Sequence, residues 1–136
     1  MKRYINNTSL ENIYGMSRVG TISSKGAILE IYVNTNDAGK IPHFHLRDMN
    51  EWSRFHTCIR IDKPEYFIHG NKQDILTTKE AKELNEFMLS PTRKPLFNEN
   101  GQRINNWEYV CMLWDDNNSD VMISEDVVQP DYSQLT

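Results

Sequence analysis

The sequence lacks most features that mark secreted, membrane-spanning or dinucleotide-binding proteins. Only two cysteines occur in 136 residues, and Cys58 and Cys111 lie far apart in apolar contexts, which favours free thiols over a disulfide. No stretch approaches the roughly 18 consecutive apolar residues of a membrane helix, and no apolar segment follows the basic N-terminal residues as in a secretion signal. Six glycines and no phosphate-cradling loop exclude a Rossmann or P-loop site. We therefore expect a cytoplasmic protein that does not bind membranes.

Recognisable catalytic motifs are missing as well. The chain contains no G-x-S-x-G, C-x-x-C or H-E-x-x-H. Glu30 and Asp62 lie on predicted strands, but one carboxylate per strand is typical of a solvated face and not of an acid–base dyad. The sequence thus leans towards a protein that is not an enzyme.

Charge is distributed unevenly along the chain. Residues 1–103 carry 15 basic and 12 acidic side chains, a net +3, whereas residues 104–136 carry no Lys or Arg and seven acids, a net −7. The acidic end can be a solvated tail, a clamp on the basic body, or a mimic of a phosphate backbone that occupies a basic groove on another protein. In the last case Asp115, Asp116 and Asp120 are the candidate partner-binding residues.

Alternating apolar residues predict an antiparallel sheet. Residues 27–34 (AILEIYVN), 41–48 (IPHFHLRD) and 55–62 (FHTCIRID) each show the period of two expected of strands. Turn formers between the first two indicate a hairpin. Residues 66–70 are interpreted as a short fourth strand. Residues 1–20 show no clean period, and a short helix, a strand and an ordered arm stay open as alternatives there.

Two helices are predicted late in the chain. Thr77 and Glu80 form a capping box for the first, which Pro91 ends, and Asn105 and Glu108 repeat this pattern for a second helix at 105–115. The alternative for the second segment is a strand paired with residues 121–124, and the last dozen residues are expected to fray.

These elements predict a single α+β domain over residues 1–136. It is an antiparallel β-meander of three to five strands covered by about two α-helices. No repeat, low-complexity segment or linker divides the chain, so residues 26–90 form a core and residues 91–136 an extension with the acidic C-terminal region.

The most suggestive short motif is Ile41–Leu46, which reads IPHFHL. On a strand, His43 and His45 point to one side, and Phe44 and Leu46 to the other. His56 lies on the next predicted strand, so His43, His45 and His56 can converge as ligands of zinc or another divalent metal, with Asp48 or Asp62 as a carboxylate ligand. No other cofactor is expected.

Two alternatives to a metal site stay open for this motif. His43 and His45 are candidate catalytic groups for acid–base chemistry or phosphate binding. The commonest role of such residues is simpler, because histidine is frequent on half-exposed strands, where one ring face packs and a nitrogen meets water.

A nucleic-acid interface is a weaker interpretation. Three arginines are interleaved with aromatic and histidine side chains, which can hold phosphates and stack on bases. Acidic residues in the same stretch dilute the positive charge, so an exposed mixed-charge loop is favoured. Trp52 in this stretch either folds back on the core or is offered to a partner. The residues are Arg47, Trp52, Arg54, Phe55, His56 and Arg60.

The segment from about Gly26 to Leu89, about half the chain, resembles a small bacterial family of unknown function. That family has an Ile-Tyr-Val-like strand, an acidic-Asn turn and then Pro-Pro-His-Phe-His, and here Ile41 replaces the first proline. Its members often occur beside a second small protein, in arrangements like toxin–antitoxin modules, so the resemblance implies a cytoplasmic protein with a protein partner. Four signature positions carry over: Pro42, His43, Phe44 and His45.

Taken together, the sequence predicts a non-enzymatic interaction protein of a bacterium, phage or mobile element that binds a protein partner. The first alternative is a histidine-dependent, metal-assisted hydrolase or nuclease that uses the HFH strand. The second alternative is an inhibitor of a host defence nuclease that presents an acidic, phosphate-mimicking surface.

Overall fold

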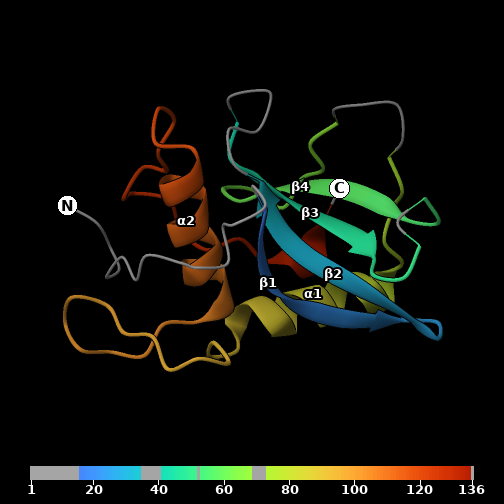
Figure 1. The fold of residues 1–136 in the computed structure, drawn as a ribbon, viewed down its shortest axis with the longest axis horizontal. Helices are drawn as coiled ribbons and strands as arrows, with labels where there is room; N and C mark the ends of the chain where they lie inside the picture. The colour runs from blue at the N-terminus through green and yellow to red at the C-terminus, as the bar shows by residue number, and fades with distance from the viewer. Residues whose placement is uncertain (1–15, 35–40, 52, 69–72, 136) are drawn as a thin grey trace.

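The computed structural model describes residues 16–34, 41–51, 53–68 and 73–135. Strands β1 and β2 are joined by a tight turn, followed by β3, β4 and two helices, α1 and α2 (Figure 1). A short 3-10 helix, η2, lies near the C-terminus. The four strands form one antiparallel sheet in the order β1-β2-β3-β4, which confirms the predicted α+β meander. The bounds are β1 Met16–Ser24, β2 Ala27–Asn34, β3 His43–Asp48, β4 His56–Arg60, α1 Thr78–Leu89, α2 Asn106–Asn117 and η2 Tyr132–Gln134.

The period of two along β2 and β3 divides the sheet into two unlike surfaces. Ile31, Phe44 and Leu46 are fully buried in the hydrophobic core. Strand register places Tyr32 of β2 opposite His45 of β3, and His45 opposite Cys58 of β4, so these side chains share the other surface. We call this surface, which carries Tyr32, His43, His45 and Cys58, the polar face. The predicted orientation of the two histidines is confirmed.

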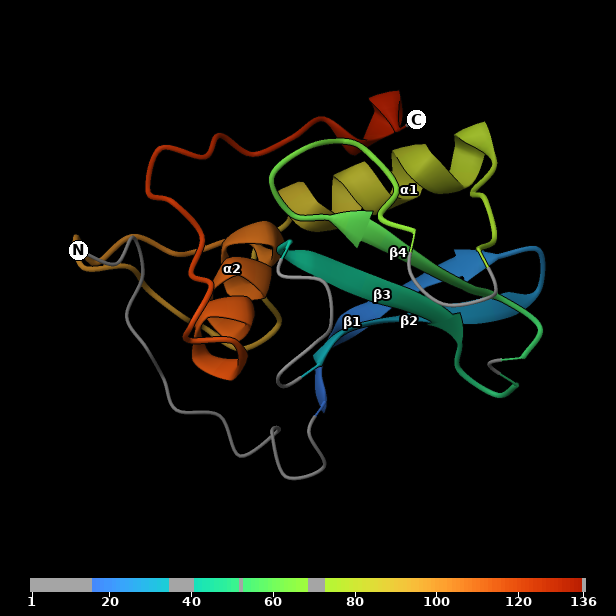
Figure 2. The ribbon, with the colours of Figure 1, turned by 90° about the horizontal axis from the view of Figure 1, so that it is seen from above.

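The helices begin where the sequence predicted. The side chains of Thr77 and Asn105 each accept a hydrogen bond from the N–H of the third helical residue. The carboxylates of these third residues, Glu80 and Glu108, accept from the N–H of the cap residue, so both capping boxes form. Helix α1 runs along the core surface of the sheet and α2 stands at one end of it (Figure 2). Neither helix among the described residues has the length and apolar character needed to cross a bilayer.

Three expectations need correction. Strand β1, which spans Met16–Ser24, was only one of three alternatives for residues 1–20, because a register shift between Arg18 and Gly20 breaks its alternation in the sequence. The fourth strand predicted at 66–70 is wrong, since Tyr66 makes only an isolated bridge to Ile59; His69 and Gly70 lie outside the described residues. The strand alternative for 105–115 is also wrong, because this segment is α2.

The predicted fraying of the C-terminal residues is wrong up to Leu135. The ring of Tyr132 is fully buried and meets Phe44 edge-on, with 5.7 Å between ring centroids. Its hydroxyl lies within hydrogen-bonding distance of the carbonyl oxygens of Arg60 (3.0 Å) and Ile61 (3.1 Å), and its N–H donates to Asn85 Oδ1. The segment is therefore docked onto the core and α1.

Candidate metal centre on the polar face

Three buried side chains with metal-binding atoms converge on the polar face. His43 and His45 project from β3 two residues apart, and Cys58 lies on β4 directly opposite His45. Their exposed fractions are 0%, 3% and 1%. One ligand atom from each lies within 4.8 Å of the others, so the three residues could hold a metal ion.

The spacing around His45 is close to that of a tetrahedral metal site. Cys58 Sγ lies 3.3 Å from His45 Nδ1, and His56 Nε2 lies 3.0 Å from the same nitrogen. With zinc bonds of about 2.0–2.1 Å to nitrogen and about 2.3 Å to sulfur, neighbouring donors of one tetrahedral ion are roughly 3.3–3.6 Å apart. The separation of Cys58 Sγ and His45 Nδ1 therefore fits two ligands of one zinc ion.

Neighbouring groups hold both imidazole rings in place. His43 Nδ1 lies 2.7 Å from the carbonyl oxygen of Ile41, so Nδ1–H donates to it and the lone pair is on Nε2. This pairing of a ring N–H with a backbone carbonyl is typical of metal-ligating histidines. The His45 ring is stacked on Tyr32, with 4.8 Å between centroids, and Asn34 Nδ2 is 3.4 Å from its Nε2.

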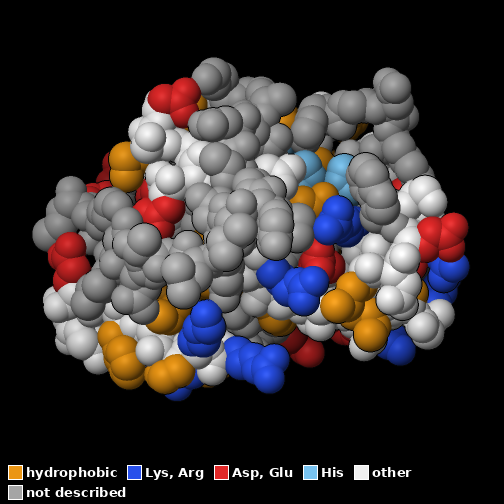
Figure 3. Space-filling view, viewed as in Figure 1, with side chains coloured by type: hydrophobic (Ala, Val, Ile, Leu, Met, Phe, Trp, Pro, Cys, Tyr) orange, Lys and Arg blue, Asp and Glu red, His pale blue; other side chains and the backbone are white. Residues whose placement is uncertain are grey.

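Apolar and aromatic groups cover the buried end of the cluster. The rings of Phe67 and Trp114 lie 4.5 and 5.3 Å from the His43 ring, between centroids. His56, at the other end, is only half-buried, and histidine side chains reach the surface of this face in Figure 3. A ligand would therefore reach the cluster from the His56 side.

A buried carboxylate orients two arginines beside the histidines. Glu30 is 2% exposed and forms ion pairs with Arg18 (2.5 Å) and Arg47 (3.1 Å). Arg47 also places its guanidinium carbon 4.6 Å from the centre of the Tyr32 ring. Because Arg18 pairs with Tyr32 in the strand register, both arginines belong to the polar face.

The structure brings together only part of the predicted metal set. His43 and His45 converge as expected, and His56 is adjacent. The third buried donor is Cys58, which the sequence interpretation did not name as a metal ligand. One signal was available, since His56 and Cys58 alternate on the same side of their strand. The proximity of Cys58 to His45 depends on strand register, which no local pattern reveals.

The two carboxylates suggested as additional ligands have other partners. Asp48 accepts hydrogen bonds from the N–H groups of Glu51 (3.0 Å) and Asn50 (2.9 Å), which lowers its pKa despite burial. Burial raises the pKa of Asp62, but the paired Arg60 guanidinium, 2.8 Å away, more than offsets this and the pKa is lowered.

The predicted partner-binding residues do not form one exposed surface. Asp115 is 6% exposed, and its carboxylate accepts a hydrogen bond from the N–H of Ile123 at 2.8 Å. Asp116 is half-buried and Asp120 is exposed. Trp52 lies outside the described residues. A role of these residues in partner binding stays a prediction.

Comparison of the chain with family models, with curated proteins and with solved structures finds no match. The resemblance to the family with the Pro-Pro-His-Phe-His strand, and the protein partner that it implies, therefore stay predictions. The function has to be argued from the polar face itself.

Proposed function

We propose that this protein is a metal-dependent hydrolase whose metal ion is held by His43, His45 and Cys58. The observation that supports the proposal is the convergence of these three buried donors on the polar face. This conclusion departs from the leaning of the sequence towards a non-enzymatic protein, which was based on missing motifs.

The donor set favours zinc. Two imidazole nitrogens and one thiolate are borderline-soft ligands, which suit zinc and exclude magnesium and calcium, both of which prefer oxygen. Zinc adopts tetrahedral geometry with such ligands and imposes no redox requirement. Cys58 forms no disulfide, which is compatible with this role.

A catalytic role suits the site better than a structural one. Structural zinc sites are closed by four protein ligands and commonly hold together domains that lack a sufficient core. Here a large hydrophobic core buries Ile31, Phe44 and Leu46 on the opposite surface of the sheet and includes none of the three donors. Three buried donors leave a fourth position, which would face the half-buried His56.

Different residues would hold the metal ion and exclude water from it during hydrolysis. A bound zinc ion would supply Lewis acidity and would lower the pKa of a water ligand to about 7. His43 and His45 are held in ligating orientation by Ile41 and Asn34. Phe67 and Trp114 exclude water from the buried end, which strengthens electrostatic interactions at the site.

Metal titration tests the site directly. The metal-free protein should bind one equivalent of zinc, and cobalt substitution should give the charge-transfer band of a cobalt–thiolate bond. His43→Ala and Cys58→Ala should each weaken binding by about 10-fold or more. Cys111→Ala removes the other buried thiol and is the matched control, with zinc affinity expected to be unchanged. Absence of stoichiometric zinc, or equal losses in the control, would contradict the site.

The hydrolase assignment needs a separate measurement. A chromogenic phosphodiester should be cleaved by the zinc-loaded protein, and His43→Ala should abolish cleavage. If zinc binds at one equivalent and no ester is hydrolysed, the site is structural and the enzymatic assignment is wrong.

A further inference from the structure

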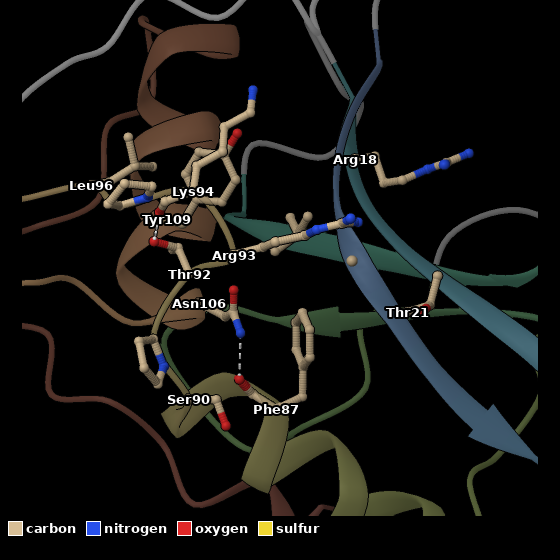
Figure 4. Close-up of a pocket in the computed structure, with 14 residues that line it drawn as sticks. Arg18, Thr21, Phe87, Ser90, Thr92, Arg93, Lys94, Leu96, Asn106 and Tyr109 are labelled. Carbon is tan, nitrogen blue, oxygen red and sulfur yellow. Dashed lines mark hydrogen bonds between the residues drawn. The ribbon is translucent and has the colours of Figure 1, made fainter.

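A pocket of about 1010 Å³ lies between β1, the end of α1 and the loop that leads to α2 (Figure 4). Its lining combines two aromatic side chains, Phe87 and Tyr109, with three cations, Arg18, Arg93 and Lys94. The described residues that line it include no carboxylate. In a protein with a net charge of −4, this is a local concentration of positive charge.

Close contacts hold the walls of this pocket. A Cβ atom at Gly20 would lie 2.6 Å from the Phe87 ring, so the missing side chain lets that ring pack directly on the backbone of β1. Asn106 donates to the carbonyl oxygen of Phe87 at 2.8 Å, drawn as a dashed line between the two labelled residues in Figure 4. Arg103 donates to the carbonyl of Thr92 in the loop at 2.5 Å. The aromatic wall and the cationic loop are thus held together.

The pocket adjoins the polar face across the edge strand β1. Arg18 and Thr21 line the pocket and pair with Tyr32 and Glu30 of β2 in the strand register. With strands about 4.8 Å apart, β1 lies roughly 10 Å from β3, which carries the histidines. Figure 3 shows Lys and Arg side chains (blue) between the histidines (pale blue) and the lower edge of this side.

The cations therefore form a track that begins at the candidate metal centre. Arg47 and Arg18 lie beside the histidines, both oriented by Glu30. Arg93 extends from the loop towards β1 in Figure 4, and Lys94 follows it in the chain. A single phosphate cannot reach all of them, whereas a chain of phosphates can contact them in succession.

We propose that the substrate is a single strand of nucleic acid, an inference that rests on the proposed hydrolase. Backbone phosphates contact Arg47, Arg18 and the Arg93–Lys94 pair, and one base enters the pocket against Phe87. A single strand is favoured over a duplex because only an unpaired base can leave its neighbours and stack on an aromatic ring.

The arginines of this track differ from those suggested by the sequence. Arg54 pairs with Glu51 at 2.7 Å and Arg60 with Asp62 at 2.8 Å, so each has an acid of its own. Arg18 and Arg47 share the single carboxylate of Glu30, which leaves that pair with a net positive charge. Arg47 is common to both sets. The substrate surface thus lies on β1, β3 and the loop before α2, away from the turn after β3.

The reaction at the metal centre is phosphodiester hydrolysis. The oxygen of one water forms the new bond to phosphorus, and the bond from phosphorus to the leaving sugar oxygen breaks. One proton of that water ends on the sugar oxygen, which gives a phosphate monoester and an alcohol. No oxidant or further reactant is consumed.

Strand binding to the metal-free, full-length protein tests the inference without turnover. Fluorescence anisotropy would use labelled DNA and RNA strands of about 12 nucleotides, within the roughly 4–16 that single-strand sites cover. At least one strand should bind, with affinity that falls as salt rises. A duplex of the same length should bind at least about 10-fold more weakly, since it offers no unpaired base.

Variants separate the two parts of the surface. Arg93→Ala/Lys94→Ala should reduce the slope of log affinity against log salt by about 1.4, because each phosphate contact contributes about 0.7. Lys79→Ala/Lys82→Ala removes the same charge from exposed positions on α1, and its slope should match the wild type. Phe87→Leu should weaken binding at least about fivefold without changing the slope, since it removes a stacking ring and no charge.

Three results would overturn the inference: no binding of either strand, equal binding of strand and duplex, or equal loss in the α1 control. Its failure is distinguishable from that of the proposed hydrolase. A protein that binds zinc and cleaves a small diester but no strand refutes only the substrate. Strand binding without any zinc site refutes the hydrolase.

Discussion

Replacement of Tyr132 measures how firmly the C-terminal segment is docked. The fully buried ring packs edge-on against Phe44, and its hydroxyl donates towards two backbone carbonyls. Truncation of a buried aromatic side chain to alanine costs about 3–5 kcal/mol. Loss of the hydroxyl bond adds about 0.5–1.5 kcal/mol. Tyr132→Ala should therefore remove about 3.5–6.5 kcal/mol of unfolding free energy, out of the roughly 5–15 kcal/mol typical of a domain.

Tyr132→Phe isolates the hydroxyl from the ring. The phenyl ring keeps the contact with Phe44, and the carbonyl of Ile61 keeps the Trp107 indole N–H at 2.9 Å as a donor. The expected loss is about 1 kcal/mol. Val128→Ala is the control in the same segment, because Val128 is 82% exposed and should change stability by less than about 0.5 kcal/mol.

Urea unfolding of the three variants decides the question, provided that the m-value is unchanged. A loss below about 1 kcal/mol for Tyr132→Ala would refute the docked arrangement and would restore the fraying tail.

The pH dependence of stability gives a second test of the buried Tyr132 hydroxyl. Burial raises the pKa of Tyr132 well above its usual value, so the unfolded tyrosine ionises first. Stability should fall as pH rises above about 10, and Tyr132→Phe should lack this contribution.

Three further predictions concern charged and capping groups. Glu30→Gln should cost about 1–3 kcal/mol in chemical denaturation, because the two arginines lose a buried ion-pair partner but keep access to water. Asn105→Ala should cost about 1–2 kcal/mol, measured by thermal unfolding, because the cap of α2 and a bond to Gln129 are both lost. Since N–H donors from Glu51 and Asn50 lower the pKa of Asp48, its stabilising contribution is present at neutral pH and is lost as pH falls through that lowered pKa. The stability difference between wild type and Asp48→Asn should therefore shrink below about pH 4, and a constant difference would contradict this cause.

Local patterns predicted the parts of the fold that depend on neighbours in the chain. Alternation along residues 27–34 and 43–48 placed both histidines on one surface, because side chains on a strand alternate. Both capping boxes formed as predicted, because each involves residues only three positions apart. The register shift in β1 hid that strand, and its pairing with β2 depends on a turn in which Lys25 and Gly26 both adopt positive φ.

The candidate site shows the same division. The sequence by itself determined that His43 and His45 emerge together and that His56 and Cys58 alternate with core residues. Only the tertiary structure decided that Cys58 lies opposite His45, that Glu30 orients two arginines beside them, and that Tyr132 returns to the core. The reason is that these contacts join residues 12 to more than 70 positions apart, and their geometry is set by strand register and helix packing rather than by neighbouring residues.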